Sequence, residues 1–122
     1  MQRYIVISLT TTVLFIINSG AACFTWPSCT ANIVPGIEII LTDAQTGRDI
    51  LGATLILAEG VYAETLQEMN LGHYSGADER PGTYTLSVQA AGYEDVIQEN
   101  IVITADICHV ITVSLEIQMN PL

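Results

Sequence analysis

Lysine is absent from this chain of 122 residues, and three arginines face 13 aspartates and glutamates. Without a lysine amine, Schiff-base chemistry, a phosphate-binding loop that ends in Gly-Lys-Ser/Thr and a lysine–asparagine isopeptide crosslink are all excluded. The formal net charge is −10, and the chain lacks the cluster of cationic side chains that would neutralise phosphates. The sequence therefore predicts no binding to nucleic acid and no affinity for an anionic membrane face. Cysteine is scarce as well: the chain has three, which allow at most one disulfide.

The first 22 residues have the layout of a secretory signal peptide. Arg3 supplies a positive charge, residues 4–17 are mostly apolar, and small residues precede Cys23. An apolar stretch of this length is shorter than the roughly 20 residues that span a bilayer, so a permanent membrane helix is the weaker interpretation. We expect residues 1–22 to be removed on export.

Cys23 stands where a bacterial lipoprotein has its acylated cysteine. The small residues before it fit that pattern, although Gly20 occupies the position at which leucine is usual. Acylation of Cys23 would anchor the protein to the inner or outer membrane, and this anchor is the only membrane contact that we expect. Ordinary cleavage would instead leave a periplasmic protein with Cys23 as a free or paired thiol. In both cases residues 23–32 are expected to form a tether.

Export permits a disulfide between the other two cysteines. In an oxidising compartment Cys29 and Cys108 are the natural pair if Cys23 is acylated. Such a bridge would close a loop of about 80 residues and stabilise the fold by up to a few kcal/mol. The alternative takes Cys108 and His109 as a metal-binding or nucleophilic pair. It is less favoured because adjacent residues of a strand point to opposite faces, and because zinc spacings such as Cys-x-x-Cys are absent.

Period-two alternation of apolar residues runs through most of residues 33–119. The pattern predicts strands at residues 38–42, 53–58, 61–66, 83–90 and 110–117, with a short segment around 73–75. Residues 96–97 and 101–103 indicate one further strand or two. Glu59–Gly60 marks a two-residue hairpin, and Tyr84, Leu86 and Val88 are expected to share one buried face. Short strands about ten residues apart, without a helical period, indicate an antiparallel β-sandwich, with a barrel as the minor alternative.

Two segments carry a resemblance to a known family. Residues 41–55 read LTDAQTGRDILGATL and residues 82–93 read GTYTLSVQAAGY. The Thr-Gly turn before an alanine-containing strand, and the Gly-Thr-Tyr strand that ends in Ala-Gly-Tyr, resemble the carboxypeptidase regulatory-like domain over residues 34–117. The resemblance implies a prealbumin-like (transthyretin-like) fold, a seven-stranded Greek-key sandwich, for residues 33–119. It also implies a non-catalytic module, because that domain accompanies the peptidase in metallocarboxypeptidases and no peptidase is present here.

Two families that share that fold narrow the activities and crosslinks to be expected here. Transthyretin-like hydroxyisourate hydrolases end in a Tyr-Arg-Gly-Ser motif, whereas this chain ends in Gln-Met-Asn-Pro-Leu, so that activity is not expected. B-type domains of collagen adhesins often carry an isopeptide bond from lysine, which is impossible here. By this resemblance, the pair Cys29 and Cys108 would fill the stapling role.

The histidines give little support to catalysis. His73 and His109 lie far apart, and no acidic residue stands at a spacing that singles out a general acid and base. We expect His73 in an exposed loop and His109 on the solvent face of the last strand. The serines lack a Gly-x-Ser-x-Gly context, so a hydrolase triad is not supported.

The acidic residues and the tyrosines allow further interpretations. Seven acids fall mostly at turns, namely Asp43, Asp49, Asp78, Glu79, Glu94, Asp95 and Asp106. Calcium binding by these carboxylates is weighed against a solvated acidic surface, which is favoured because the Asp-x-Asp-x-Asp-Gly spacing is absent. Arg80 is expected to lock its turn through Asp78 or Glu79. Tyr62 and Tyr74 could stack on sugars if exposed, together with Tyr84 and Tyr93, which are more typical of a core.

The sequence thus predicts a non-enzymatic, exported binding or structural module of the cell envelope, without cofactor or metal. Its ligand would be an unidentified protein or carbohydrate. The alternatives are a small hydrolase on a transthyretin-like scaffold, a carbohydrate-binding module, and an accessory subunit that pairs its edge strands with another protein. An enzyme should place His73 or His109 in a concave pocket with convergent polar groups.

Overall fold

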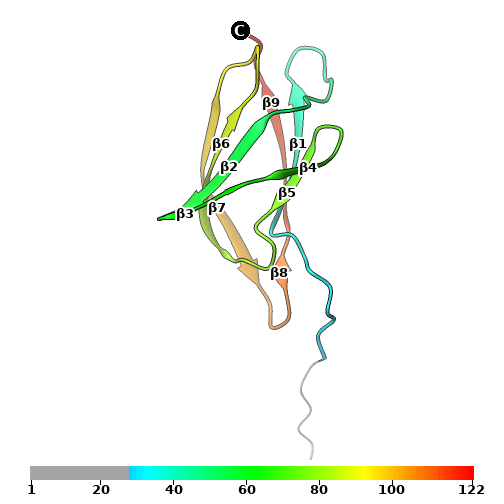
Figure 1. Cartoon of the computed structure of the whole chain (residues 1–122), viewed down its shortest axis with the longest axis vertical. Helices are drawn as coiled ribbons and strands as arrows, with labels where there is room; N and C mark the ends of the chain where they lie inside the picture. Colours follow the sequence, from blue (N-terminus) through cyan, green and yellow to red (C-terminus); the bar gives the residue numbers. More distant parts are fainter. Residues whose placement is uncertain (1–27) are drawn as a thin grey trace, which may run out of the picture.

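The computed structural model describes residues 28–122, where nine β-strands form two sheets (Figure 1). The signal peptide of residues 1–22, the acylation of Cys23 and residues 23–27 of the tether at residues 23–32 therefore lie outside the described residues. The strands are β1 (Ile37–Asp43), β2 (Thr54–Glu59), β3 (Tyr62–Thr65), β4 (Gln67–Asn70), β5 (His73–Gly76), β6 (Gly82–Gln89), β7 (Val96–Ala105), β8 (Val110–Ile111) and β9 (Val113–Met119). The all-β class and the sandwich-like pair of sheets are confirmed.

The four-stranded sheet has the order β4-β5-β1-β9, and β1 pairs with β5 antiparallel and with β9 parallel. The five-stranded sheet has the order β3-β2-β6-β7-β8 and is antiparallel throughout, curling like half a barrel. Because β1 lies beside β9, residues of segments 37–43 and 113–119 meet on one face of the four-stranded sheet.

The strand count is nine where seven were expected, and two short strands account for the difference. Strand β4 is exposed at all four positions, so the alternation of apolar residues gave no signal for it. Strand β8 is separated from β9 by Thr112, whose hydroxyl donates to the carbonyl oxygen of Pro35 at 2.7 Å. Of the one or two strands expected between residues 96 and 103, the structure has one, because a register shift opposite β6 and a φ of 58° at Asn100 accommodate the polar middle of β7.

The core lies between the sheets and is built from the alternation that the sequence predicts. Tyr84, Leu86 and Val88 are all buried, as expected for one face of β6. Ile117 of β9 is buried too. The β2–β3 hairpin turns at Gly60 and Val61, one residue later than predicted. Gly60 has a φ of 59°, a conformation that favours glycine.

Cys29 and Cys108 form the expected disulfide, with a sequence separation of 79 and 5.3 Å between their Cα atoms. The bridge joins the segment that precedes β1 to the turn between β7 and β8, at the end of the sandwich opposite the C-terminus (Figure 1). A disulfide is consistent with an oxidising location outside the cytoplasm. In residues 28–122 no helix is long and apolar enough to span a membrane.

Candidate functional site

His109 lies in the turn between β7 and β8, not on the solvent face of the last strand as expected, and its side chain is 20% exposed. Its Nδ1 donates to Oε2 of Glu79 at 2.6 Å, and its Nε2 lies 3.0 Å from the hydroxyl oxygen of Thr30. With the proton on Nδ1, Nε2 accepts the hydrogen bond from Thr30. A carboxylate, an imidazole and a hydroxyl therefore stand in the order of a hydrolase triad.

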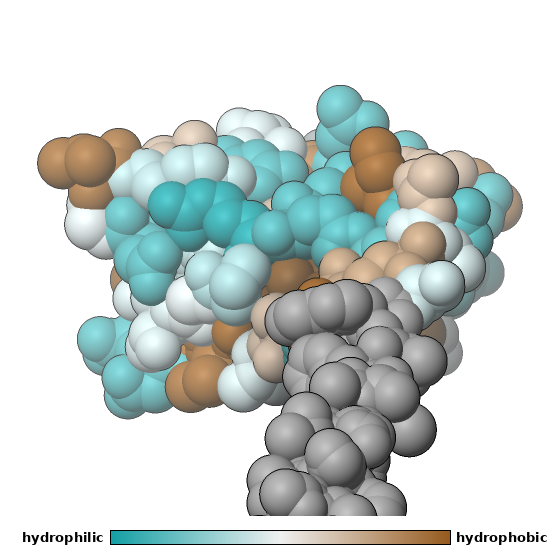
Figure 2. Space-filling view, turned by 90° about the horizontal axis from the view of Figure 1, so that it is seen from below, coloured by the Kyte–Doolittle hydropathy of each residue, from teal (hydrophilic) through white to brown (hydrophobic). Residues whose placement is uncertain are grey.

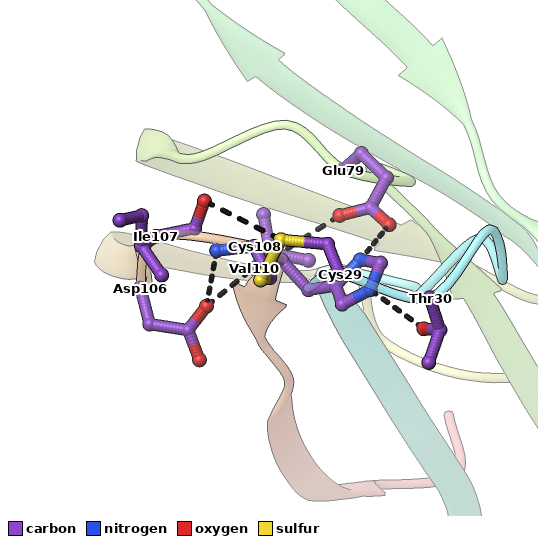
Figure 3. The surroundings of a disulfide bond; sticks show 8 residues. Cys29, Thr30, Glu79, Asp106, Ile107, Cys108 and Val110 are labelled. Carbon is purple, nitrogen blue, oxygen red and sulfur yellow. Dashed lines mark hydrogen bonds and ion pairs between the residues drawn. A yellow bond between two sulfur atoms is a disulfide. The ribbon is translucent and has the colours of Figure 1, made fainter. Parts of the chain in front are cut away.

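The neighbouring hydrogen bonds point to a structural role for this cluster. Glu79 also accepts the backbone N–H groups of Val34 at 3.0 Å and Val110 at 3.2 Å. The N–H groups of Cys108 and His109, which could have stabilised an oxyanion, both donate to Oδ1 of Asp106 instead (Figure 3). Burial disfavours the charged form of Glu79, but the bonds from His109 and the two N–H groups outweigh it and hold the pKa of Glu79 below its usual value.

We call this cluster the clasp and define it as Cys29, Thr30, Glu79, Asp106, Cys108 and His109. It borders a hollow of about 400 Å³, so His109 meets part of the criterion stated above for an enzyme. The clasp connects the segment before β1 to the turn between β5 and β6, which carries Glu79, and to the turn between β7 and β8, which carries Asp106, Cys108 and His109. Its bonds to the backbone are those of a structural fastening.

Arg80 pairs with Glu59, not with its sequence neighbours Asp78 or Glu79 as expected. Its Nη1 lies 2.9 Å from Oε1 of Glu59, and its guanidinium carbon lies 3.6 Å from the centroid of the Tyr62 ring. This position fixes the start of β6 against the end of β2, since the other oxygen of Glu59 accepts the backbone N–H of Thr83. Hydrogen bonds from Thr83 and Arg80 lower the pKa of Glu59.

The tyrosines in the described residues do not form the exposed sugar-stacking face that the sequence left open. Tyr74 and Tyr84 are buried. Tyr93 donates its hydroxyl to Oδ2 of Asp43 at 2.7 Å. The hydroxyl of Tyr62 donates to Glu64, and this bond, burial and the charge of Glu64 together raise the pKa of Tyr62 to about 12.

The turn carboxylates support the backbone around them. Asp43 accepts the N–H groups of Gln45 at 2.7 Å and Thr46 at 3.0 Å. The hydrogen bond from Tyr93 is the main reason that the pKa of Asp43 is lowered, and the bond from Thr46 adds to it. Across residues 28–122, no three side chains of His, Cys, Asp or Glu are arranged to hold a metal ion.

A second hollow, of about 650 Å³, lies on the outer face of the four-stranded sheet. We call it the sheet groove and define it by six lining residues, Glu38, Ile40, Met69, His73, Ser75 and Glu116. In the register of the sheet, Ile40 of β1 lies opposite His73 of β5 and Glu116 of β9. One row therefore carries an imidazole, an aliphatic side chain and a carboxylate across three strands.

The next row of the sheet groove places Glu38 between Ser75 of β5 and Ser114 of β9. Glu38 and Glu116 are diagonal neighbours on parallel strands, with their Cα atoms roughly 8 Å apart from the spacing of strands and residues. Among residues 28–122 no hydrogen bond or ion pair involves the side chains of Glu38, Glu116 or His73, and the two ion pairs that occur there belong to Arg80 and His109. The two carboxylates and the imidazole are therefore available to a ligand.

The sheet groove also exposes apolar surface. Met69 is 63% exposed and Ile40 is 37% exposed. A neighbouring hollow of about 400 Å³ shares Met69, Ser75 and Pro35 with the sheet groove and adds Ile33 and Asp78. The two hollows form a continuous depression from β9 to the edge of β4, beside the segment that leads into β1.

His73 was expected in an exposed loop, whereas it lies on β5 with its side chain exposed. No local sequence pattern singles out Glu38 or Glu116 as site residues. The alternation along β1 could have shown that Glu38 points outward, but nothing in the sequence indicates that β1 and β9 are parallel neighbours. The sheet groove was therefore not predictable from local patterns.

No protein-family model matches the chain, and a search of the curated proteins finds no match.

Proposed function

We propose that the protein is an exported, non-enzymatic binding module and that the sheet groove is its ligand site. The observation that carries this proposal is the hollow of about 650 Å³, in which exposed apolar side chains lie beside charged groups without a partner in residues 28–122. Ligand sites in proteins commonly have volumes of about 300–1,000 Å³ and combine an apolar lining with a few polar groups.

The end of the domain seen in Figure 2 is more hydrophilic than this groove. Viewed from the end at which the segment before β1 approaches the sheets, hydrophilic residues cover much of the visible surface and hydrophobic ones form small separate patches (Figure 2). Large continuous apolar areas mark interaction sites more strongly than scattered single residues do. In the sheet groove, exposed apolar groups line a hollow of about 650 Å³.

A ligand screen that includes a matched control tests this proposal. Fragments of positive, negative and zero charge are tested for binding by ligand-observed NMR, first with the unaltered protein and then with Ser75→Trp, which fills the groove from β5. Ser87→Trp is the control, because Ser87 is a half-buried serine on the outer face of the other sheet. We expect hits that bind the unaltered protein and Ser87→Trp but not Ser75→Trp. Equal binding to all three proteins, or no hits at all, would refute the proposal.

The alternative is a small hydrolase, and the order Thr30, His109 and Glu79 in the clasp is the observation that favours it. A hydrolase of this type needs the hydroxyl of Thr30 as its nucleophile. Hydrolysis of an activated ester that is lost in Thr30→Val and kept in Thr112→Val would support the hydrolase. The binding-module proposal expects no difference between these variants.

We also propose that the domain is a carboxypeptidase regulatory-like, prealbumin-type sandwich. When the short strands β4 and β8 are set aside, β5-β1-β9 faces β3-β2-β6-β7, which makes seven strands. The chain crosses repeatedly between the sheets, as a Greek-key sandwich requires. This strand order supports the resemblance found in residues 41–55 and 82–93.

For its location we propose the cell envelope, with a lipid on Cys23. The disulfide supports an oxidising compartment. Attachment through the segment before β1 would leave the outer face of the four-stranded sheet accessible. The intact mass of the protein from native membranes tests both points. A chain that begins at an acylated Cys23 and gains two daltons on reduction supports the proposal, and an unlipidated chain with three free thiols contradicts it.

A further inference from the structure

We infer that the sheet groove recognises a basic, extended segment of a partner protein. This inference rests on the proposed function and names the class of ligand for the same site. It follows from the charge of the groove, from its apolar floor and from its length.

The charge of the groove selects cations. Glu38 and Glu116 lie on adjacent strands of one face and lack a cationic partner within the described residues. Arg80 is held by Glu59 elsewhere in the molecule. An excess of acidic groups over the whole chain strengthens the negative potential, which concentrates cations and repels phosphates, carboxylates and sulfated sugars.

The apolar surface determines which cations fit. Met69 and Ile40 are exposed between the acidic groups, and Ile33 of the adjoining hollow is 72% exposed. A hydrated metal ion makes no use of such surface. Lysine and arginine do, because their methylene stems pack on apolar groups while the charged ends reach carboxylates.

The length of the depression favours a chain over a small amine. Three strand spacings separate β9 from β4, which amounts to roughly 14 Å, the length of about four extended residues. Carboxylates stand toward both ends, with Glu38 and Glu116 on one side and Asp78 in the adjoining hollow on the other. A slender polyamine would fill only a minor part of the hollow of about 650 Å³.

The partner must be another protein, because this chain has no basic segment of its own. Lysine is absent, and the three arginines, Arg3, Arg48 and Arg80, are far apart in sequence. A second copy would likewise bring carboxylates to carboxylates.

The inference is tested by fluorescence anisotropy with the exported protein and a labelled hexapeptide of alternating lysine and valine. The comparison probes are the same peptide with glutamate in place of lysine, and unlabelled spermidine as competitor. We expect the lysine peptide to bind and the glutamate peptide not to bind. Glu38→Gln and Glu116→Gln should each weaken binding about twofold to fivefold, and the double variant about tenfold, since exposed charge pairs contribute modestly. A rise in salt from about 20 mM to 500 mM should weaken binding roughly tenfold.

Glu99→Gln is the matched control, because Glu99 is an exposed acid on β7 of the other sheet. It should bind the lysine peptide as the unaltered protein does. Equal binding of the glutamate peptide, unchanged binding by the double variant or full competition by spermidine at equal concentration would each overturn the inference. If neutral or anionic fragments occupy the sheet groove while the lysine peptide does not bind, the inference fails and the proposed function stands. If neither fragments nor peptide bind there, both fail.

Discussion

Removal of the disulfide by Cys29→Ser together with Cys108→Ser is expected to lower the stability of the domain strongly. The bridge spans 79 residues in sequence and therefore restrains most of the unfolded chain. On the loop-entropy relation, closure of a loop of this length at 25 °C is worth about 4.5 kcal/mol. This figure is an upper value, because real unfolded chains are already partly compact.

The hydrogen bonds of the clasp should keep the segment before β1 in place when the disulfide is removed. Thr30 still contacts His109 at 3.0 Å, and Val34 still donates to Glu79 at 3.0 Å. The segment before β1 therefore stays docked in the folded protein, and the loss arises mainly from greater freedom of the unfolded chain. We expect the free energy of unfolding to fall by about 3 kcal/mol. For a domain of this size that corresponds to a fall in Tm of roughly 12–24 °C.

The assay is thermal unfolding followed by circular dichroism, on the oxidised protein, on the double variant and on Thr30→Val. The Thr30→Val variant loses only one exposed hydrogen bond of the clasp, so its Tm should fall by a few degrees at most. A fall of less than about 4 °C in the double variant would refute the reasoning, because the bridge would then not restrain the unfolded chain. A fall as large in Thr30→Val would assign the stability to the hydrogen bond between Thr30 and His109 rather than to the disulfide.

Three further predictions concern the fold. The pKa values of Asp43, Glu59 and Asp106 are lowered by hydrogen bonds in the folded state, so the unfolded chain takes up protons first as the pH falls. The stabilisation from these three carboxylates should thus be fully present above about pH 5 and decline below about pH 4. Urea unfolding at pH 6 and pH 3 measures this change. Equal unfolding midpoints at the two pH values would contradict the prediction. Tyr74→Phe should lower the free energy of unfolding by about 1–2 kcal/mol, because the Tyr74 hydroxyl donates to the carbonyl of Ile50 and accepts the N–H of Ala53. Chemical denaturation measures this loss. An unchanged free energy of unfolding would show that water replaces these two hydrogen bonds. Gly36→Ala should cost about 1–3 kcal/mol in the same assay, because a Cβ there would lie 2.5 Å from the carbonyl oxygen of Ala77, and an unchanged midpoint would show that this backbone gives way easily.

The elements that the sequence predicts well are those whose apolar residues alternate. Strand β6 is the clearest case, because its buried positions are aromatic or aliphatic and its exposed positions are polar. Strand β4 escaped prediction because all four of its residues are exposed, so that only pairing with β5 defines it. The disulfide was predictable for a different reason, since three cysteines allow only three pairings and the predicted acylation of Cys23 leaves one of them.

The candidate site was much harder to predict than the fold. Glu38 and Glu116 lie 78 positions apart and become neighbours only through the parallel pairing of β1 with β9. His109 looked like a strand residue, but the turn between β7 and β8 brings it to Glu79 and Thr30. Such contacts depend on which strands pair and in which register, and the alternation within one strand carries no information about either.

The most direct test of the sheet groove as the ligand site is a map of backbone amide shifts. The ¹⁵N-labelled protein is titrated with the lysine–valine hexapeptide, and the shift changes are compared between the two sheets. The account predicts the largest changes in residues 37–43, 73–76 and 113–119, which form β1, β5 and β9, and small changes in β2, β6 and β7. Changes concentrated on the five-stranded sheet or at the clasp would contradict it.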